Sequence, residues 1–325
     1  MSLRLLLSDL ANRLVVLVII VGLTFLLPRL LPGDPLDLMA SPDAARSLTV
    51  EEAKRLRVVM GLDGTWLEQF LAYLQRLATG DLGYSLQHAA PVGAILAKAM
   101  PWTALLIGLS LPIFLIVGVG TGIEAGLRRH SAIDRGLTSA MAVVGSLPPF
   151  AWAVFLLIGF AIAWPVFPSA GAEPLFPAAN WWVRTTDVLR HAALPAIALA
   201  MHEVVRYFFL ARGETIVLTA RPFMVNARAR GVRGVRGWRL RHNYLFANMR
   251  APLLARLSDS VTGLVTAILF VELAFSYPGV GQVIYLAILQ RDYSLLQGAV
   301  LMLSAMVLLI NWVVDIAAAN LADRG

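Results

Sequence analysis

Residues that could carry enzymatic chemistry are few in this chain of 325 residues. It contains no cysteine, which excludes disulfides, thiolate metal sites and thiol nucleophiles. The two lysines, Lys54 and Lys98, both follow alanine, so the chain lacks the Gly-Lys-Ser/Thr of a Walker A loop, which cradles nucleotide phosphates. The histidines form no H-x-x-x-H pair, and no Ser/His/Asp set or carboxylate pair has a recognisable spacing. The sequence predicts a protein that is not an enzyme and holds no metal or cofactor.

The strongest chemical signal is positive charge between Arg212 and Arg250. This stretch holds nine arginines and one acid, Glu214, which gives it more net charge than the +7 of the whole chain. Within it, Phe223, Ala227 and Gly231 recur at every fourth residue and so share one face of a helix. Small residues permit close approach of a partner backbone, and Pro222 suits a first helical turn. The pattern predicts a short docking helix or, alternatively, a surface helix that packs on its own membrane domain.

The composition indicates that the elements around this stretch lie in a membrane. Hydrophobic residues make up 58% of the chain and charged residues only 14%, whereas soluble domains carry about 25% charged residues. Apolar residues occur in long blocks without period-two alternation, which favours helices over a barrel. We therefore predict an all-α, polytopic membrane protein. Arginine-rich cytoplasmic loops explain the basic character, so no nucleic-acid partner is expected.

Six membrane-spanning helices are expected, because each needs about 20 mainly apolar residues. They are residues 11–31, 102–126, 137–164, 192–212, 253–275 and 294–318. The arginine-rich loops 127–136 and 213–252 should face the cytoplasm, which puts both termini there as well. The segment 33–100, with eight acids and six bases, should then be extracytoplasmic.

This organisation divides the chain into four parts. Residues 1–32 form the cytoplasmic N-terminus and first span, and 33–100 a small helical cap outside the membrane. Residues 101–318 form a core of five spans, and 319–325 a cytoplasmic tail. In the cap we expect a helix whose capping box pairs Thr49 with Glu52, and a second, amphipathic helix over 66–78 that ends at Gly80.

Three residues are candidates for a pathway or gate. Pro148 and Pro149 interrupt an apolar span, where adjacent prolines remove a hydrogen-bond donor and kink or break a helix; the break either shapes a pore or is plain helix geometry. Glu272 stands at the end of an expected span. It either lines a translocation path or caps backbone amides at the membrane edge.

Motifs spread over nearly the whole chain resemble those of one protein family. They are Leu30-Leu-Pro-Gly-Asp-Pro35, Gly80-Asp-Leu-Gly-Tyr-Ser85, Pro91-Val92, Pro101-Trp-Thr103, Gly145-Ser-Leu-Pro-Pro-Phe-Ala-Trp152, Phe275-Ser-Tyr-Pro-Gly-Val-Gly281 and Arg291-Asp-Tyr293. Each is weak alone, but their order and spacing are specific. The chain resembles the integral membrane subunits of ABC importers of the dipeptide, oligopeptide and nickel class, which implies a type I permease fold.

The resemblance also gives the small-residue motif a role. Ala227-Arg-Ala-Arg-Gly231, followed by Asn248 and Pro252, is similar to the family's "EAA" loop, whose helix docks on an ATPase subunit. The implied coupling residues are Phe223, Ala227, Arg228, Ala229, Arg230 and Gly231. The chain departs from the family in two ways. The tandem Val232-Arg-Gly234 and Val235-Arg-Gly237 lengthens the loop, and Arg221-Pro222 replaces an acidic residue before the helix.

The implied partners are a second homologous permease subunit, two ATP-binding subunits that hold ATP and Mg, an extracytoplasmic substrate-binding protein, and lipid. The implied location is a bacterial cytoplasmic membrane, and the implied substrates are peptides. Nickel or another small solute is an alternative. An ion-coupled secondary transporter is a more distant one, since spans 102–126 and 294–318 are nearly free of charge and such transporters place charges within the membrane.

Overall fold

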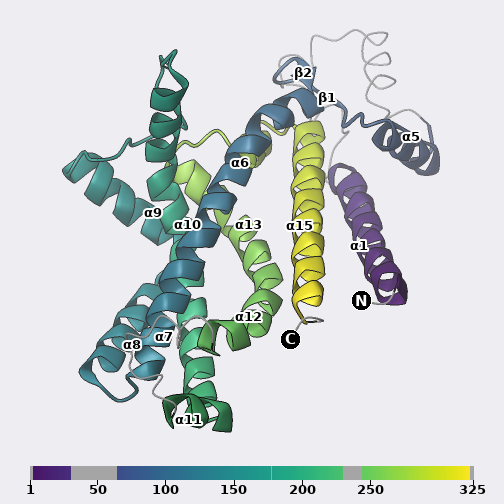
Figure 1. Ribbon diagram of the computed structural model, residues 1–325. Coiled ribbons are helices and arrows are strands. Elements are labelled where there is room, and N and C mark those ends of the chain that lie inside the picture. The colour runs from purple at the N-terminus through teal and green to yellow at the C-terminus, as the bar shows by residue number, and fades with distance from the viewer. Residues whose placement is uncertain (1–2, 31–63, 177, 230–243, 323–325) are drawn as a thin grey trace. The chain divides into compact units, whose positions relative to one another are not determined.

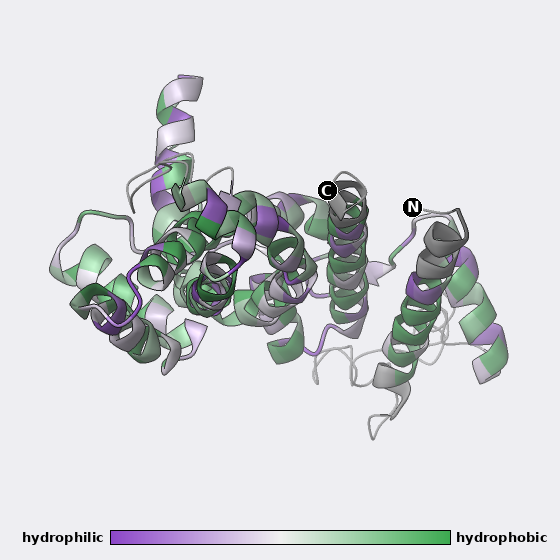
Figure 2. Ribbon diagram, turned by 60° about the horizontal axis from the view of Figure 1, so that its bottom comes forward, coloured by the Kyte–Doolittle hydropathy of each residue, from purple (hydrophilic) through white to green (hydrophobic). Residues whose placement is uncertain are grey.

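A computed structural model covers the chain and describes residues 3–30, 64–176, 178–229 and 244–322. The described residues are mostly helical (Figure 1), as the apolar blocks predict. They fall into two compact units, one of residues 1–103 and 278–308 and one of residues 104–277 and 309–325. Hydrophobic residues cover much of the helical ribbon, including the helix that leads to the C-terminus (Figure 2).

The first unit contains α1 (Leu3–Leu30), α5 (Trp66–Ala78), α14 (Val280–Leu289) and most of α15 (Tyr293–Ala322). The amphipathic helix predicted over 66–78 is confirmed as α5. Its apolar face includes Phe70 and Tyr73, whose rings lie 5.0 and 5.8 Å from that of Phe25 on α1. The helix α14 is not among the elements predicted from the sequence.

A capping box starts α5, where none was predicted. The Thr65 hydroxyl accepts a hydrogen bond from the backbone N–H of Glu68, and the Glu68 carboxylate accepts one from the Thr65 N–H at 2.7 Å. This second bond, followed by one from the hydroxyl, holds the pKa of the Glu68 carboxyl below its ordinary value. The box expected at Thr49 and Glu52 lies outside the described residues.

Two tight contacts in the first unit join motifs that are far apart in the sequence. The strands β1 (Tyr84–Ser85) and β2 (Ala90–Pro91) pair antiparallel, and the buried Ser85 hydroxyl donates to the Asp292 carboxylate just before α15. Separately, the Thr103 hydroxyl on α6 (Val92–Phe114) accepts a 2.8 Å hydrogen bond from the backbone N–H of Val280. These contacts give the motifs around Ser85, Thr103, Val280 and Asp292 a structural role.

The second unit is built around α10 (Trp181–Thr219), a helix of 39 residues. Packed on it are the π-helical turn η1 (Leu115–Val119), α7 (Gly120–Leu127), α8 (Ala132–Gly145), α9 (Pro149–Leu157), α12 (Ala247–Ala255) and α13 (Leu257–Ala274). A second π-helical turn, η2 (Ile158–Ala163), continues α9, and the short α11 (Pro222–Ala229) follows α10 directly. Figure 1 labels these helices around α10.

Within the described residues, four helical stretches are long and apolar enough to cross a membrane: Val92–Leu127, Trp181–Thr219, Leu257–Ala274 and Tyr293–Ile316. They contain or closely match four of the expected spans. The expected span 137–164 is instead a pair of helices, Ala132–Gly145 and Pro149–Ala163, bent by 96°. The break that Pro148 and Pro149 predict is thus confirmed, with Pro149 at the first turn of α9.

The first expected span, 11–31, falls on α1, whose apolar stretch Ala11–Leu26 is shorter than the other spans. The structure thus supports four spans, or five when the bent pair counts as one. The total of six and the extracytoplasmic cap stay predictions.

Three glycines, one in η1 and two in α7, explain how this stretch approaches α10 so closely. Gly118, Gly122 and Gly126 lie four residues apart, and a Cβ on each would come within 2.5 to 2.8 Å of an atom of α10. At Gly122 the nearest atom is the backbone carbonyl oxygen of Phe208. Small residues at this spacing let two helices pack backbone to backbone in a membrane.

Gly122→Ala is expected to destabilise the protein by about 1–3 kcal/mol, because the added methyl group must push α7 away from rigid backbone. The measurement is the thermal unfolding midpoint of the detergent-solubilised protein. Gly120→Ala is the control, since a Cβ there meets nothing within 4 Å. Equal midpoints for the two variants would contradict the packing argument.

Candidate functional site

A cavity of about 360 Å³ lies in the second unit between α9, α10 and α13. Its walls are largely apolar and include Phe150, Leu199, Leu264 and Phe270. The predicted gate residues Pro148 and Pro149, at the break in the bent helix pair, line one side of it. The proline break therefore borders this cavity, and a gate role for Pro148 and Pro149 stays a prediction.

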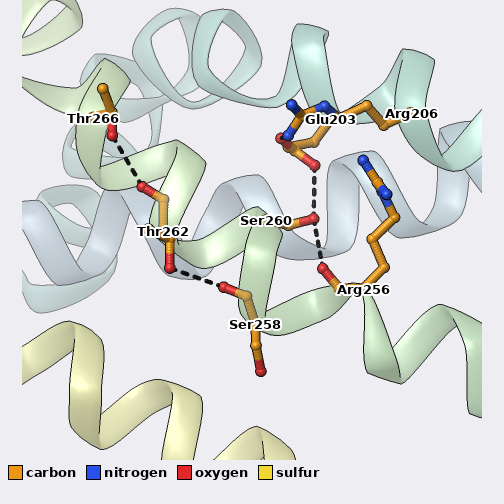
Figure 3. A network of polar contacts seen from close by, with 7 residues as sticks. All are labelled: Glu203, Arg206, Arg256, Ser258, Ser260, Thr262 and Thr266. Atoms are coloured by element: carbon orange, nitrogen blue, oxygen red, sulfur yellow. Dashed lines mark hydrogen bonds and ion pairs between the residues drawn. The ribbon is translucent and has the colours of Figure 1, made fainter.

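Three polar side chains of α10 also line this cavity, His202, Glu203 and Arg206. Arg206 Nη1 donates a hydrogen bond of 3.0 Å to Glu203 Oε1 within an ion pair. The other carboxylate oxygen accepts a 2.7 Å bond from the Ser260 hydroxyl on α13. Figure 3 shows Glu203 between Arg206 and Ser260.

The α13 side of this network is built from small and hydroxyl residues. Ser260 Oγ also lies 3.1 Å from the backbone carbonyl oxygen of Arg256, so its single hydrogen is shared between this carbonyl and the Glu203 carboxylate (Figure 3). A Cβ at Gly263 would lie only 3.3 Å from Glu203 Oε1, so glycine leaves room for the ion pair. Of the pair, the Glu203 side chain is 3% exposed and the Arg206 side chain 40% exposed.

In this cavity the guanidinium of Arg206 is accessible, whereas the carboxylate of Glu203 is buried. Charged side chains within membrane helices are costly and face the interior of a bundle or a water-filled space. The sequence signal for this site is the pair of charges, Glu203 and Arg206, within an otherwise apolar span. Neither residue is among the candidates predicted from the sequence. The structure makes Pro148, Pro149, Glu203 and Arg206 neighbours around one space.

Glu272, the third predicted gate residue, does not line this cavity. It is fully buried near the end of α13, and its backbone carbonyl accepts a 2.7 Å hydrogen bond from the Tyr277 N–H. Burial, and then the negative charge of Glu272, raise the pKa of the Tyr277 hydroxyl. A pathway role for Glu272 stays a prediction.

The predicted docking residues lie on and beyond α11. Met224 and Ala227 are buried, at 0% and 3% exposure, so they form the inner face of this helix. Phe223 and Val225 are 36% and 56% exposed, and Ala229 is exposed as well. The side chain of Arg228, together with Arg230, Gly231 and the Val-Arg-Gly tandem, lies outside what the structure describes.

An ion pair that the sequence did not predict anchors α8 to α10. Arg212 Nε and Nη2 donate to the two carboxylate oxygens of Asp134 at 2.6 and 2.9 Å. Asp134 is 3% exposed and also accepts a 2.9 Å bond from the His130 N–H. The pair ties the turn before α8 to the part of α10 that leads into α11.

Ser85, His88 and Asp292 meet in the first unit, although no such set was predicted from spacing. Ser85 Oγ lies 3.2 Å from His88 Nδ1 and donates to Asp292, which also accepts a 3.0 Å bond from the Leu295 N–H. A hydrolytic triad needs an accessible serine whose hydroxyl hydrogen-bonds a histidine that the acid orients. Here the serine is fully buried and bonds the acid directly, so the cluster is a structural tie.

Comparison with known proteins assigns the chain to a family. Residues 118–324 match the binding-protein-dependent transport system inner membrane component, and residues 2–107 match the N-terminal part of the membrane component of the same systems. The chain belongs to this family. It is a membrane-embedded component of a transport system, as its motifs and apolar helices predict.

Relatives extend along nearly the full chain. A putative peptide permease protein of Brucella suis biovar 1 is 33% identical over 93% of this chain and 92% of its own length. The di/tripeptide transport system permease protein DppB of Pseudomonas aeruginosa is 29% identical, and the dipeptide transport system permease protein DppB of Escherichia coli K12 is 27% identical. Each of these two matches covers 90% of both chains. The resemblance to ABC importer permeases is confirmed.

Proposed function

We propose that this chain is the membrane-spanning permease subunit of an ATP-driven ABC importer and forms half of a translocation pathway for peptides. The observation that carries the proposal is the match of nearly the whole chain to peptide permeases. The cavity with its accessible arginine supports it, because a solute needs a polar space among apolar helices. A second homologous permease subunit would supply the other half.

The energy would come from two partner subunits that bind ATP and Mg. Their docking site on this chain is α11 with the residues that follow it, namely Phe223, Ala227, Arg228, Ala229, Arg230 and Gly231. Because Ala227 faces inward in the structure, Phe223 is the member of the stripe that offers an exposed side chain. Ala227 would then set how closely α11 lies against its own domain.

The short connection between α11 and α10 would let docking of the ATP-binding subunits on α11 affect the cavity. Only Ala220 and Arg221 separate α10 from α11, and α10 carries Glu203 and Arg206. A displacement of α11 when the ATP-binding subunits close would therefore act on one end of the helix that lines the cavity. Such a rigid-body change between two states is the physical basis of alternating access.

The proposed orientation puts both termini and the loop 213–252 in the cytoplasm of a bacterial cell. Segment 33–100 would then lie outside, where an extracytoplasmic binding protein delivers its peptide. The nine arginines between Arg212 and Arg250 support this orientation, because such loops stay on the cytoplasmic side. The complex would be surrounded by lipid and would bind no nucleic acid.

The test is uptake of a labelled tripeptide into liposomes that contain the permease pair. Uptake is expected only when the binding protein, the ATP-binding subunits and ATP are all present. The control replaces ATP by a proton or sodium gradient across the same membrane. Uptake driven by the gradient without the ATP-binding subunits would show an ion-coupled transporter and contradict the proposal.

A further inference from the structure

The unusual feature of the cavity is that its ion pair is exposed on one side only. Glu203 is enclosed, with one carboxylate oxygen bonded to Arg206 and the other to Ser260. Arg206 has five N–H donors, and the hydrogen bonds found among the described residues engage its Nη1. With 40% of its side chain exposed, Arg206 is accessible, whereas Glu203 at 3% is not.

The accessible charge of the cavity is therefore positive, although the pair as a whole is neutral. His202, which lines the same space, adds a second nitrogen-bearing side chain, and its Nδ1 is buried without a hydrogen-bond partner among the described residues. A guanidinium is the side chain best matched to a carboxylate, which it binds through two parallel hydrogen bonds. Phe150, Leu199 and Phe270 line the same space and would contact the apolar part of a bound solute.

We propose that Arg206 binds the C-terminal carboxylate of a peptide as it passes through the permease, with Glu203 and Ser260 holding the guanidinium in position. This inference rests on the proposed function and assigns a substrate contact within it. The size of the cavity suits one end of a peptide, because about 360 Å³ lies at the small end of ligand pockets. The apolar wall would accept side chains of varied shape, while the arginine reads a group that every unmodified peptide carries.

The experiment compares two tripeptides of the same sequence, one with a free C-terminal carboxylate and one with a C-terminal amide. Both are offered to the complete reconstituted complex with saturating binding protein. For each permease variant the ratio of the two uptake rates is measured. The binding protein is the same throughout, so its own preference cancels when the ratio of a variant is divided by that of the wild type.

Arg206→Gln is expected to lower uptake of the free acid by about tenfold or more, because the loss of one hydrogen bond to a charged group has an effect of this size. Uptake of the amide should stay nearly unchanged. Arg206→Lys keeps the charge without the planar fork and should lose only part of the preference. Arg190→Gln, an exposed arginine elsewhere on α10, is the control and should keep the wild-type ratio.

The double variant Glu203→Gln/Arg206→Gln separates recognition from structure. If Arg206 serves only to neutralise the buried Glu203, removing both charges restores uptake of both peptides. If it binds the carboxylate, the double variant folds but still lacks the preference for the free acid. This variant and Arg206→Lys also carry the test if Arg206→Gln fails to assemble.

Equal losses for the acid and the amide in Arg206→Gln, or an unchanged ratio, would overturn the carboxylate site and leave the importer assignment intact. A wild-type complex that takes up neither peptide would instead contradict the proposed function, and this inference with it. The two failures are thus distinguishable in one set of measurements.

Discussion

Phe223→Ala is expected to uncouple ATP hydrolysis from peptide uptake, with uptake lowered about tenfold or more while the protein still folds and inserts. Phe223 is 36% exposed on α11, and aromatic residues, Phe included, are enriched at protein interfaces. Truncation of an interface anchor often costs about 2 kcal/mol or more of binding energy. Substrate-stimulated ATPase activity and uptake, measured on the same proteoliposomes, test the prediction.

Val225→Ala is the matched control for this variant. Val225 is 56% exposed on the same short helix but two residues further on, so it points to a different side. Uptake should stay near that of the wild type in this variant. If both variants lose uptake equally, the effect comes from damage to α11 rather than from one docking face, and normal coupling in Phe223→Ala would sink the docking assignment. A bulky residue at Gly231 should reproduce the Phe223→Ala phenotype.

The sequence predicts where several helices begin and break better than it predicts how far they extend and what they pack against. Periodicity and turn residues placed α5 at 66–78, and adjacent prolines placed the break before α9, because both effects are local to the backbone. The same apolar pattern missed α14 and gave only part of α10. A helix that extends past a span is stabilised by packing, which a hydropathy window does not contain.

The residues around the cavity also show that a local sequence pattern does not reveal contacts made by packing. Glu203 and Arg206 were visible as charges in an apolar segment, and the residues that complete their site were not. Ser260 lies 57 residues after Glu203 in the chain, and Gly263 lies further still. Nothing in their local sequence marks them as partners of a carboxylate. Only the packing of α13 on α10 joins them.

The composition of the basic stretch also predicted less than the structure shows. Taken together, its arginines indicate membrane orientation, yet Arg212 has a defined partner in Asp134, 78 residues earlier. Net charge identifies the side of the membrane that a loop faces. It does not distinguish an arginine that a buried carboxylate requires from one that only faces solvent.

Arg212→Ala is accordingly expected to lower the amount of folded protein strongly. It leaves the nearly enclosed Asp134 carboxylate without its cation, and breaking a buried ion pair from one side typically costs about 3–5 kcal/mol. Asp134→Asn should be milder, since the Arg212 side chain is 26% exposed and can be solvated after its partner is neutralised. The measurement is the yield and unfolding midpoint of each variant in detergent.

Two further variants show whether the loss comes from the pair itself. Arg129→Ala removes one exposed positive charge from the neighbouring turn and should stay close to the wild type. Asp134→Asn/Arg212→Ala removes both charges and should recover much of the stability lost in Arg212→Ala, because no carboxylate is then left unpaired. Failure of the double variant to recover would mean that Arg212 stabilises the protein through interactions other than its ion pair with Asp134. Recovery would mean that the stability lost in Arg212→Ala comes from the unpaired Asp134 carboxylate, and so that the Asp134–Arg212 ion pair itself stabilises the packing of α8 on α10.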